Sequence, residues 1–277
     1  MFIERFKLTV EQKAKPYAKY FYQEPAPCDP KQLAKMDNAI DPSQALPIDR
    51  MNDLLNPGYL ECETGWCVMP DGSAFIANHS MFKGVTLDML RWWFAWHSLD
   101  DLRYKIWWPK GHFHITVDEK SREKILDPST PMNEKLWGMT HHVVESCDAP
   151  TENIYINFKS PEDMGFNMDR FDHKTMAAFG GCGVSQMINP PPGAPNHKGS
   201  AAMLHFCREV EGGVEMRSRF WIGKKILNKK PIHCLPGGVK LPFFVAKCLA
   251  RHNVMEYANL ARLIPAIYPE QGPRMED

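Results

Sequence analysis

The sequence predicts an α+β fold in which a curved antiparallel sheet surrounds one long C-terminal helix. Three observations lead to this prediction. Apolar residues recur at helical spacing across residues 242–264, most segments between residues 59 and 222 alternate as strands do, and tight turns such as Pro70-Asp71-Gly72 join neighbouring strands. A sheet that packs against a helix in this way leaves room for a cavity between the two layers.

The composition is that of a globular protein with a large core. The chain has 277 residues, of which 44% are hydrophobic, enough for one large domain with an appendage. Its 33 basic and 33 acidic side chains balance, so charge favours neither nucleic acid nor an acidic membrane as a partner. No apolar run is long enough for a membrane span, and the charged N-terminus does not resemble a signal peptide.

The eight cysteines are scattered, and none of them forms a Cys-x-x-Cys pair. This scatter predicts reduced thiols that are mostly buried. Because reduced thiols are typical of the cytoplasm, we expect a cytoplasmic protein. The sequence contains neither a glycine-rich phosphate loop nor a Gly-x-Ser-x-Gly elbow. Nucleotide chemistry and a serine-esterase triad therefore lack support.

Residues 1–50 differ from the rest and predict an N-terminal arm, while residues 51–277 predict the main domain. A helical stretch over residues 10–21 is followed by repeated prolines, which keep the segment from building a core of its own. Arms of this kind wrap their own domain or a partner subunit. We therefore expect a homodimer held partly by the arm.

The main domain begins with a predicted hairpin and helix. Strands over residues 59–69 and 73–81 flank the turn at Pro70. Thr86 then caps a helix that extends to residue 97 or 98, and the aromatic residues of this helix are expected in the core.

The next segment carries the first candidate site residues. Residues 103–108 alternate cleanly, which predicts a strand with Tyr104 on one face. His112 and His114 follow the strand. On an extended segment these two histidines, two positions apart, would share a face.

The middle of the chain predicts further antiparallel strands over residues 136–146, 153–158 and 176–188. Glu145 shares a face of the first of these with His141 and Val143. The proline-rich loop over residues 189–195 is stiff and could serve as a lid.

A hairpin over residues 200–210 and 214–222 follows, joined by Glu211-Gly212-Gly213. His205 stands in the middle of its first strand, on an apolar face. From the residues alone, His205 could be a satisfied core histidine or a functional one.

The predicted C-terminal helix carries His252 and Glu256, four residues apart and therefore on the same face. Pro242 suits its first turn, and Pro265 is expected to end it. A buried imidazole and carboxylate are costly unless they share a cation. The alternative is an exposed ion pair, and two ligands alone do not make a zinc site.

Four separate motifs together resemble the diacetylphloroglucinol hydrolase and phloretin hydrolase family. They are residues 101–112, residues 140–145, Met203 to His205 with residues 215–223, and residues 251–256. The resemblance extends from about Tyr59 to the end of the last helix and is weaker over the N-terminal arm. It implies a START-like, polyketide-cyclase-like helix-grip fold. It also implies a zinc-dependent hydrolase that cleaves the carbon–carbon bond between an acyl group and a polyhydroxylated ring.

Matched motif by motif, the resemblance implies four metal ligands: His112, Glu145, His252 and Glu256. Two histidines and two carboxylates suit zinc, and Fe(II) or Mn(II) less well. His114 is a rival to His112. His141 and His142 are expected in structural or supporting roles.

The resemblance further implies catalytic roles for Tyr104 and His205, which would hold ring hydroxyls and pass a proton, while Glu145 could double as a base. Phe220 replaces an expected phenolic contact, and Ile115 an expected polar side chain. Both make the pocket less polar. The resemblance implies a small aromatic ketone as substrate, such as diacetylphloroglucinol or phloretin.

Two other classes of function stay open at this point, since a fold alone does not determine a function. One is a hydrolase or cyclase that acts on another β-dicarbonyl-like ketone. The other is a ligand-binding protein of the same fold without catalytic activity.

Overall fold

The structure is a computed structural model that describes residues 7–148, 150–190, 192–193, 196 and 198–276. The predicted lid over residues 189–195 lies partly outside the described residues.

One large antiparallel sheet forms the centre of the molecule. Among the described residues it has eight strands in the order β1-β2-β8-β7-β6-β5-β4-β3, and every neighbouring pair is antiparallel. The strands are β1 (Gly65–Val68), β2 (Ala74–Lys83), β3 (His112–Thr116), β4 (Thr140–Glu145), β5 (Glu152–Lys159), β6 (Met176–Met187), β7 (Gly199–Val210) and β8 (Gly213–Ile222). A separate two-stranded sheet of β9 (Lys224–Leu227) and β10 (Lys230–His233) was not predicted.

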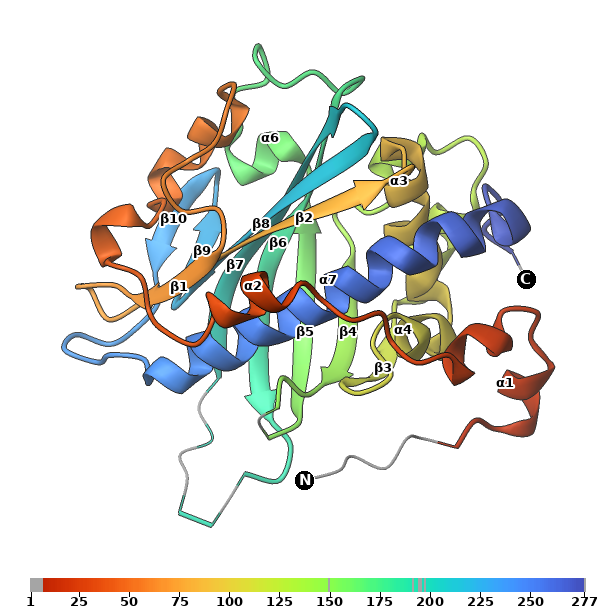
Figure 1. Cartoon of the computed structure of the whole chain (residues 1–277), viewed down its shortest axis with the longest axis horizontal. Helices are drawn as coiled ribbons and strands as arrows, with labels where there is room; N and C mark the ends of the chain where they lie inside the picture. The colour runs from red at the N-terminus through yellow and green to blue at the C-terminus, as the bar shows by residue number, and fades with distance from the viewer. Residues whose placement is uncertain (1–6, 149, 191, 194–195, 197, 277) are drawn as a thin grey trace.

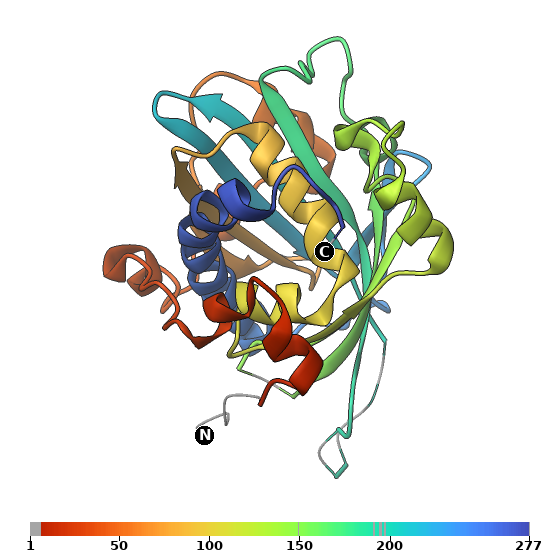
Figure 2. The ribbon, with the colours of Figure 1, turned by 90° about the vertical axis from the view of Figure 1, so that its right-hand side faces the viewer.

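The helices and short 3-10 helices cover both faces of the sheet, because alternate residues of its strands pack into two separate core clusters, each of which includes helical residues. The helices are α1 (Val10–Ala14), α2 (Pro30–Ala34), α3 (Leu87–Trp96), α4 (Asp101–Trp107), α5 (Glu119–Leu126), α6 (Pro161–Met164), α7 (Phe243–Gln271), η1 (Ala18–Tyr22), η2 (Pro42–Gln44), η3 (Ile48–Leu55), η4 (His97–Leu99) and η5 (Met132–Glu134). The long helix α7 crosses in front of the sheet (Figure 1), and the side view shows α3 and α7 on the same side of it (Figure 2). The prediction of an α+β fold with a large antiparallel sheet and a C-terminal helix is confirmed.

Both predicted hairpins are confirmed. β1 pairs with β2, although β1 covers only Gly65–Val68 of the predicted residues 59–69, and β7 pairs with β8 from Ala201 to Val210. The helix after Thr86 is also confirmed, because Oγ1 of Thr86 accepts a hydrogen bond from the backbone N–H of Met89 at 3.3 Å. The tryptophans of α3 are buried in the core between the sheet and α7, as expected: Trp92, Trp93 and Trp96.

The predicted strand over residues 103–108 is wrong, because this segment forms helix α4. The carboxylate of Asp100 caps the helix by accepting a hydrogen bond from the backbone N–H of Leu102 at 2.7 Å. Most side chains of α4 are buried, including the charged Arg103. Since several sides of the helix are covered, its alternating pattern of polar and apolar residues does not reflect a strand.

The predicted end of the last helix at Pro265 is also wrong. Helix α7 continues to Gln271 with two prolines inside it, Pro265 and Pro269. A proline removes one backbone hydrogen bond and crowds the preceding turn. The residues around it, Leu263, Ile264 and Ile267, are fully buried, so their packing outweighs that cost.

The N-terminal arm packs on its own domain (Figure 1). Lys15 forms an ion pair with Asp100, and the hydroxyl of Tyr20 donates a hydrogen bond to the carbonyl of Ala266 at 2.9 Å. Further along, the indole N–H of Trp66 donates to the carbonyl of Met36 at 2.8 Å. Within the described ranges, no helix is both long and apolar enough to cross a membrane.

Candidate metal centre

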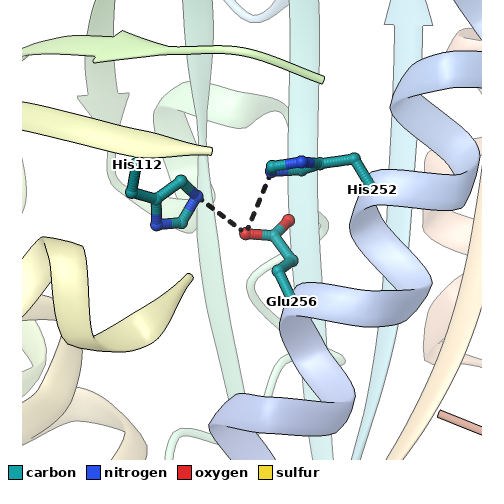
Figure 3. Close-up of side chains that lie close together, drawn as sticks. All are labelled: His112, His252 and Glu256. Atoms are coloured by element: carbon teal, nitrogen blue, oxygen red, sulfur yellow. Dashed lines mark ion pairs between the residues drawn. The ribbon is translucent and has the colours of Figure 1, made fainter. Parts of the chain in front are cut away.

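Three predicted ligands, His112, His252 and Glu256, meet between the sheet and α7 (Figure 3). Nε2 of His112 lies 3.3 Å from Oε2 of Glu256, and Nε2 of His252 lies 3.7 Å from the same oxygen. One ligand atom from each residue lies within 4.8 Å of the others, and all three side chains are buried. Two imidazoles and a carboxylate at this spacing could hold a metal ion.

His112 is held with one ring nitrogen free to face the cluster. Its Nδ1–H donates to the backbone carbonyl of Tyr104 at 3.2 Å, and its ring stacks on the Tyr104 ring at 3.9 Å between centroids. This bond fixes the tautomer that leaves Nε2 without a proton. A backbone carbonyl behind a histidine is typical of metal-binding histidines.

His114 lies away from the cluster, so the prediction that it shares a face with His112 is wrong. The pairing of β3 with β4 shifts register between the two histidines, as at a β-bulge. His114 is about 43% exposed, and its Nδ1 lies 2.8 Å from Oδ1 of Asp101. The structure therefore brings His112, not its rival, to Glu256.

Helix α7 supplies the other two side chains from one face. Asn253 supports Glu256, because its Nδ2 donates to Oε1 of that carboxylate at 3.1 Å. The side-chain oxygen of Asn253 in turn accepts from Nδ2 of Asn78 on β2 at 2.8 Å. These amide bonds fix the carboxylate and leave Oε2 directed at the two histidines.

Glu145, the fourth predicted ligand, lies at the edge of the cluster. It pairs opposite His112 in the sheet, and its Oε2 lies 4.0 Å from Nε2 of that histidine. The same oxygen accepts a hydrogen bond from the hydroxyl of Tyr104 at 2.5 Å. Glu145 is therefore close enough to take part in the site, and Tyr104 sets its orientation.

The pKa values in the cluster show that the groups are poorly solvated. Burial raises the pKa of Glu256 well above its ordinary value, and the charge of Glu145 adds to the effect. Burial raises the pKa of Glu145 to about 7, although its bond to Tyr104 acts in the opposite direction. Burial lowers the pKa of His252 to about 4. Burial also lowers the pKa of His112 well below its usual range, and the positive charge that His252 would carry when protonated adds to this effect.

The directions of these four pKa shifts fit a cation-binding site. Metal binding requires neutral imidazoles, and both histidines are neutral at physiological pH. It also requires ionised carboxylates, which a divalent cation would stabilise against the cost of burial. The residues present therefore fit a metal ion of the zinc type.

His205 lies beside the cluster on β7 and does not join it. Its Nδ1 hydrogen-bonds Oγ of Ser218 at 2.8 Å, and its Nε2 hydrogen-bonds the hydroxyl of Tyr257 at 3.0 Å. Burial lowers the pKa of His205 to about 3. His205 is thus a satisfied buried histidine and also faces the pocket.

The cluster lies in the wall of one continuous pocket. Both replacements noted from the sequence, Phe220 and Ile115, line it, and the apolar side of the pocket also includes Phe94, Trp107, Val143, Ile156, Phe158, Met203 and Leu249. Further polar side chains contribute to the lining: His97, Tyr104, His141, His205 and Tyr257. A largely apolar pocket with few polar groups suits a small aromatic ligand.

The sequence reasoning missed three residues of this site. Tyr257 and Asn253 stand directly beside the predicted ligands in the sequence, which is a signal that could have identified them. His97 lies at the end of the helix after Thr86, and its Nδ1–H donates to the carbonyl of Trp93 at 2.8 Å. No sequence pattern linked His97 to the pocket.

The chain is similar to two kinds of named hydrolase. A phloretin hydrolase from Eubacterium ramulus is 34% identical over 265 residues, which cover 94% of this chain and 92% of that protein. A 2,4-diacetylphloroglucinol hydrolase from Pseudomonas protegens is 26% identical over 273 residues, which cover 93% of this chain and 85% of that protein.

Among solved structures, the crystal structure of Ara h 8.0201 matches with a TM-score of 0.39 and 10% identity, over 70% of this chain and 99% of that chain. At that TM-score the likeness is too weak to assign a fold. The family model described as the DAPG hydrolase PhiG domain matches residues 46–269. The chain therefore belongs to the DAPG hydrolase PhiG domain family.

Proposed function

We propose that this protein is a zinc-dependent hydrolase that cleaves the aryl–acyl carbon–carbon bond of acylphloroglucinol-type ketones. The observation that carries the proposal is the buried group of His112, His252 and Glu256 in an apolar pocket. The family and its two kinds of named relatives supply the substrate class. The products would be a phenol and a carboxylic acid.

The reaction adds water across one bond. The hydroxyl of water goes to the acyl carbon, and its proton goes to the ring carbon that leaves. The proposed ligands are His112, His252, Glu256 and Glu145. A bound zinc ion supplies Lewis acidity, which polarises a carbonyl and lowers the pKa of water.

The roles of the protein groups follow from their positions. Glu145, held in place by Tyr104, could double as the base for water if it is only loosely bound to the metal. His205 faces the pocket and is neutral, so it can bind a ring hydroxyl and pass a proton toward the ring carbon. Both ring nitrogens of His205 are already hydrogen-bonded, Nδ1 to Ser218 and Nε2 to Tyr257, so a substrate hydroxyl would have to displace the Tyr257 hydroxyl from Nε2 for this role.

The experiment is to incubate the purified protein separately with phloretin and with 2,4-diacetylphloroglucinol and to identify the products by mass spectrometry. Release of a phenol and a carboxylic acid supports the proposal, and the better substrate defines the position within the family. If neither ketone is cleaved while the protein binds one metal ion, the substrate must be another ketone.

Three further predictions from the sequence, which concern fold type, location and oligomeric state, are also proposals. They are the START-like helix-grip assignment, the cytoplasmic location and the homodimer with its arm of residues 1–50. Sedimentation of the full chain and of a variant without the arm would test the dimer.

A further inference from the structure

His141 has a ring nitrogen, Nε2, that is buried without a hydrogen-bond partner in the part of the chain that the structure describes. The residue is about 1% exposed and lines the same pocket as the candidate metal centre. Buried polar atoms of native proteins almost always have a partner, so an orphan calls for an explanation. A bound ligand would provide one.

The surroundings of His141 offer no partner for this nitrogen. Its ring lies 4.6 Å from the ring of Phe158 and 5.8 Å from that of His97, measured between centroids. Phe158 has no polar group, and His97 already donates its Nδ1–H to Trp93. Nε2 of His141 therefore stays without a hydrogen-bond partner beside two ring side chains of the pocket lining, Phe158 and His97.

The neighbouring histidine provides a contrast. His142 points to the other face of β4, where its Nε2 bonds Oδ1 of Asn153 at 2.9 Å and its ring stacks on Tyr155 at 4.5 Å. The outward histidine is thus satisfied by the protein, whereas the inward one is not. This difference points to a role for His141 toward something that enters the pocket.

The position of His141 defines what that ligand must carry. His141 and Glu145 share a face of β4 four residues apart, which corresponds to about 13 Å along the strand. A ligand that spans the space between them needs a polar group at each end and an apolar middle. An aromatic ketone with a ring hydroxyl opposite its acyl group has this arrangement.

The charge state of His141 favours a hydroxyl over a carboxylate. Burial lowers the pKa of His141 well below its ordinary value, and the nearby His97 lowers it further. A neutral imidazole has one donor and one acceptor nitrogen, and a phenolic hydroxyl can pair with either. A charged ligand would gain no ion pair from it.

We propose that His141 determines substrate specificity by hydrogen-bonding, through Nε2, the ring hydroxyl para to the acyl group of the substrate. This inference rests on the proposed function and adds the contact that selects the hydroxylation pattern. In this proposal His205 and Tyr104 act near the bond that breaks, whereas His141 binds the hydroxyl on the opposite side of the ring.

The experiment compares three metal-loaded, full-length variants, His141→Phe, His141→Gln and the matched control His142→Phe, with the parent protein. The substrates are phloretin and its analogue that lacks the ring hydroxyl para to the acyl group. The parent should prefer phloretin by roughly 10²-fold in kcat/KM, because a site built to bond a hydroxyl rejects the analogue without it.

His141→Phe should raise KM for phloretin roughly tenfold or more and reduce the preference to about one, with an unchanged metal content. His141→Gln should restore part of the preference, and His142→Phe should behave like the parent. Because Nε2 has no protein partner, His141→Phe should not lower the melting temperature. A preference that survives in His141→Phe, or that is lost equally in His142→Phe, would overturn the proposal.

A failure of the proposed function can be recognised separately. If the parent protein cleaves neither ketone, calorimetry measures binding of the same two compounds to the parent and to His141→Phe. A preference for phloretin that disappears in His141→Phe supports the role of His141 without catalysis. Binding of neither compound, or equal binding of both by the parent, contradicts it.

Discussion

Nε2 of His112 lies 3.3 Å from Oε2 of Glu256, although His112 begins strand β3 and Glu256 belongs to helix α7. The candidate centre thus exists only when the edge of the sheet and the C-terminal helix are packed together. A metal ion bound there would stabilise the folded state, because the unfolded chain does not hold the ligands together.

Tyr104→Phe should lower kcat on the cleaved ketone by roughly 10²-fold while the metal content stays the same. The substitution removes the hydroxyl that donates to Oε2 of Glu145 and leaves that carboxylate without its orienting bond. Steady-state kinetics and elemental analysis of the same sample measure both effects. Tyr155→Phe, on the exposed side of β5, is the matched control. An unchanged kcat in Tyr104→Phe would remove Tyr104 from the mechanism.

His205→Gln should retain the metal and lose turnover, by roughly 10²-fold or more. His205 bonds Ser218 and Tyr257 and not the three clustered ligands. Metal content and kcat, measured together, distinguish the two possible roles. Loss of zinc from this variant would require His205 to be reassigned as a ligand.

The sequence predicted the architecture well where side-chain periodicity reflects one buried face. The hairpins β1–β2 and β7–β8 and the inward set of His141, Val143 and Glu145 follow directly from alternation. Helix α4 was predicted as a strand, because its side chains are buried on several sides and therefore show no single apolar face. Asp100, which caps this helix, was a signal in the sequence that could have indicated it.

The site was predictable in its residues but not in its geometry. The pair His252 and Glu256 follows from helical spacing, and the structure places both beside His112. The choice between His112 and His114 depends on a register shift in β3, which depends on tertiary packing. The free nitrogen of His141 could not be predicted either, because it depends on which neighbours surround the ring.

Gly111→Ala should weaken metal binding and lower the free energy of unfolding by about 1–3 kcal/mol. A Cβ at this position would lie 2.5 Å from the carbonyl oxygen of Ser146 and 3.0 Å from Cε1 of His252. The backbone carbonyl cannot move as a flexible side chain can, so the loop and His252 must shift. Chemical denaturation and a zinc titration measure the two effects.

Gly237→Ala is the control for this substitution, because a Cβ there meets no atom within 4 Å. Zinc affinity in Gly111→Ala equal to that of the parent would show that the close approach of Gly111 does not position His252.

Glu215→Gln should destabilise the protein at neutral pH, and the difference from the parent should disappear in acid. Glu215 is buried on β8, where it accepts hydrogen bonds from His79 at 2.8 Å and from Tyr59 at 3.0 Å and pairs with Arg208. Burial acts to raise its pKa, but these bonds outweigh burial and lower the pKa to about 2.

A lowered pKa stabilises the fold at pH values above the unfolded-state pKa of about 4.3, and this contribution is lost as the pH falls toward 2. The contribution is about 3 kcal/mol, since one pKa unit corresponds to about 1.4 kcal/mol. Urea unfolding of both proteins at pH 7 and pH 3 measures the difference, with the exposed Glu162→Gln as control. A difference that does not shrink at pH 3 would show that ionisation of Glu215 is not its source.

The metal content of the purified protein, measured with its cleavage activity before and after chelation, tests the central claim most directly. We predict about one zinc ion per chain, loss of cleavage with the chelator, recovery when zinc is restored, and neither metal nor activity in His252→Ala. Full cleavage of phloretin or 2,4-diacetylphloroglucinol by protein without any bound metal would contradict the account.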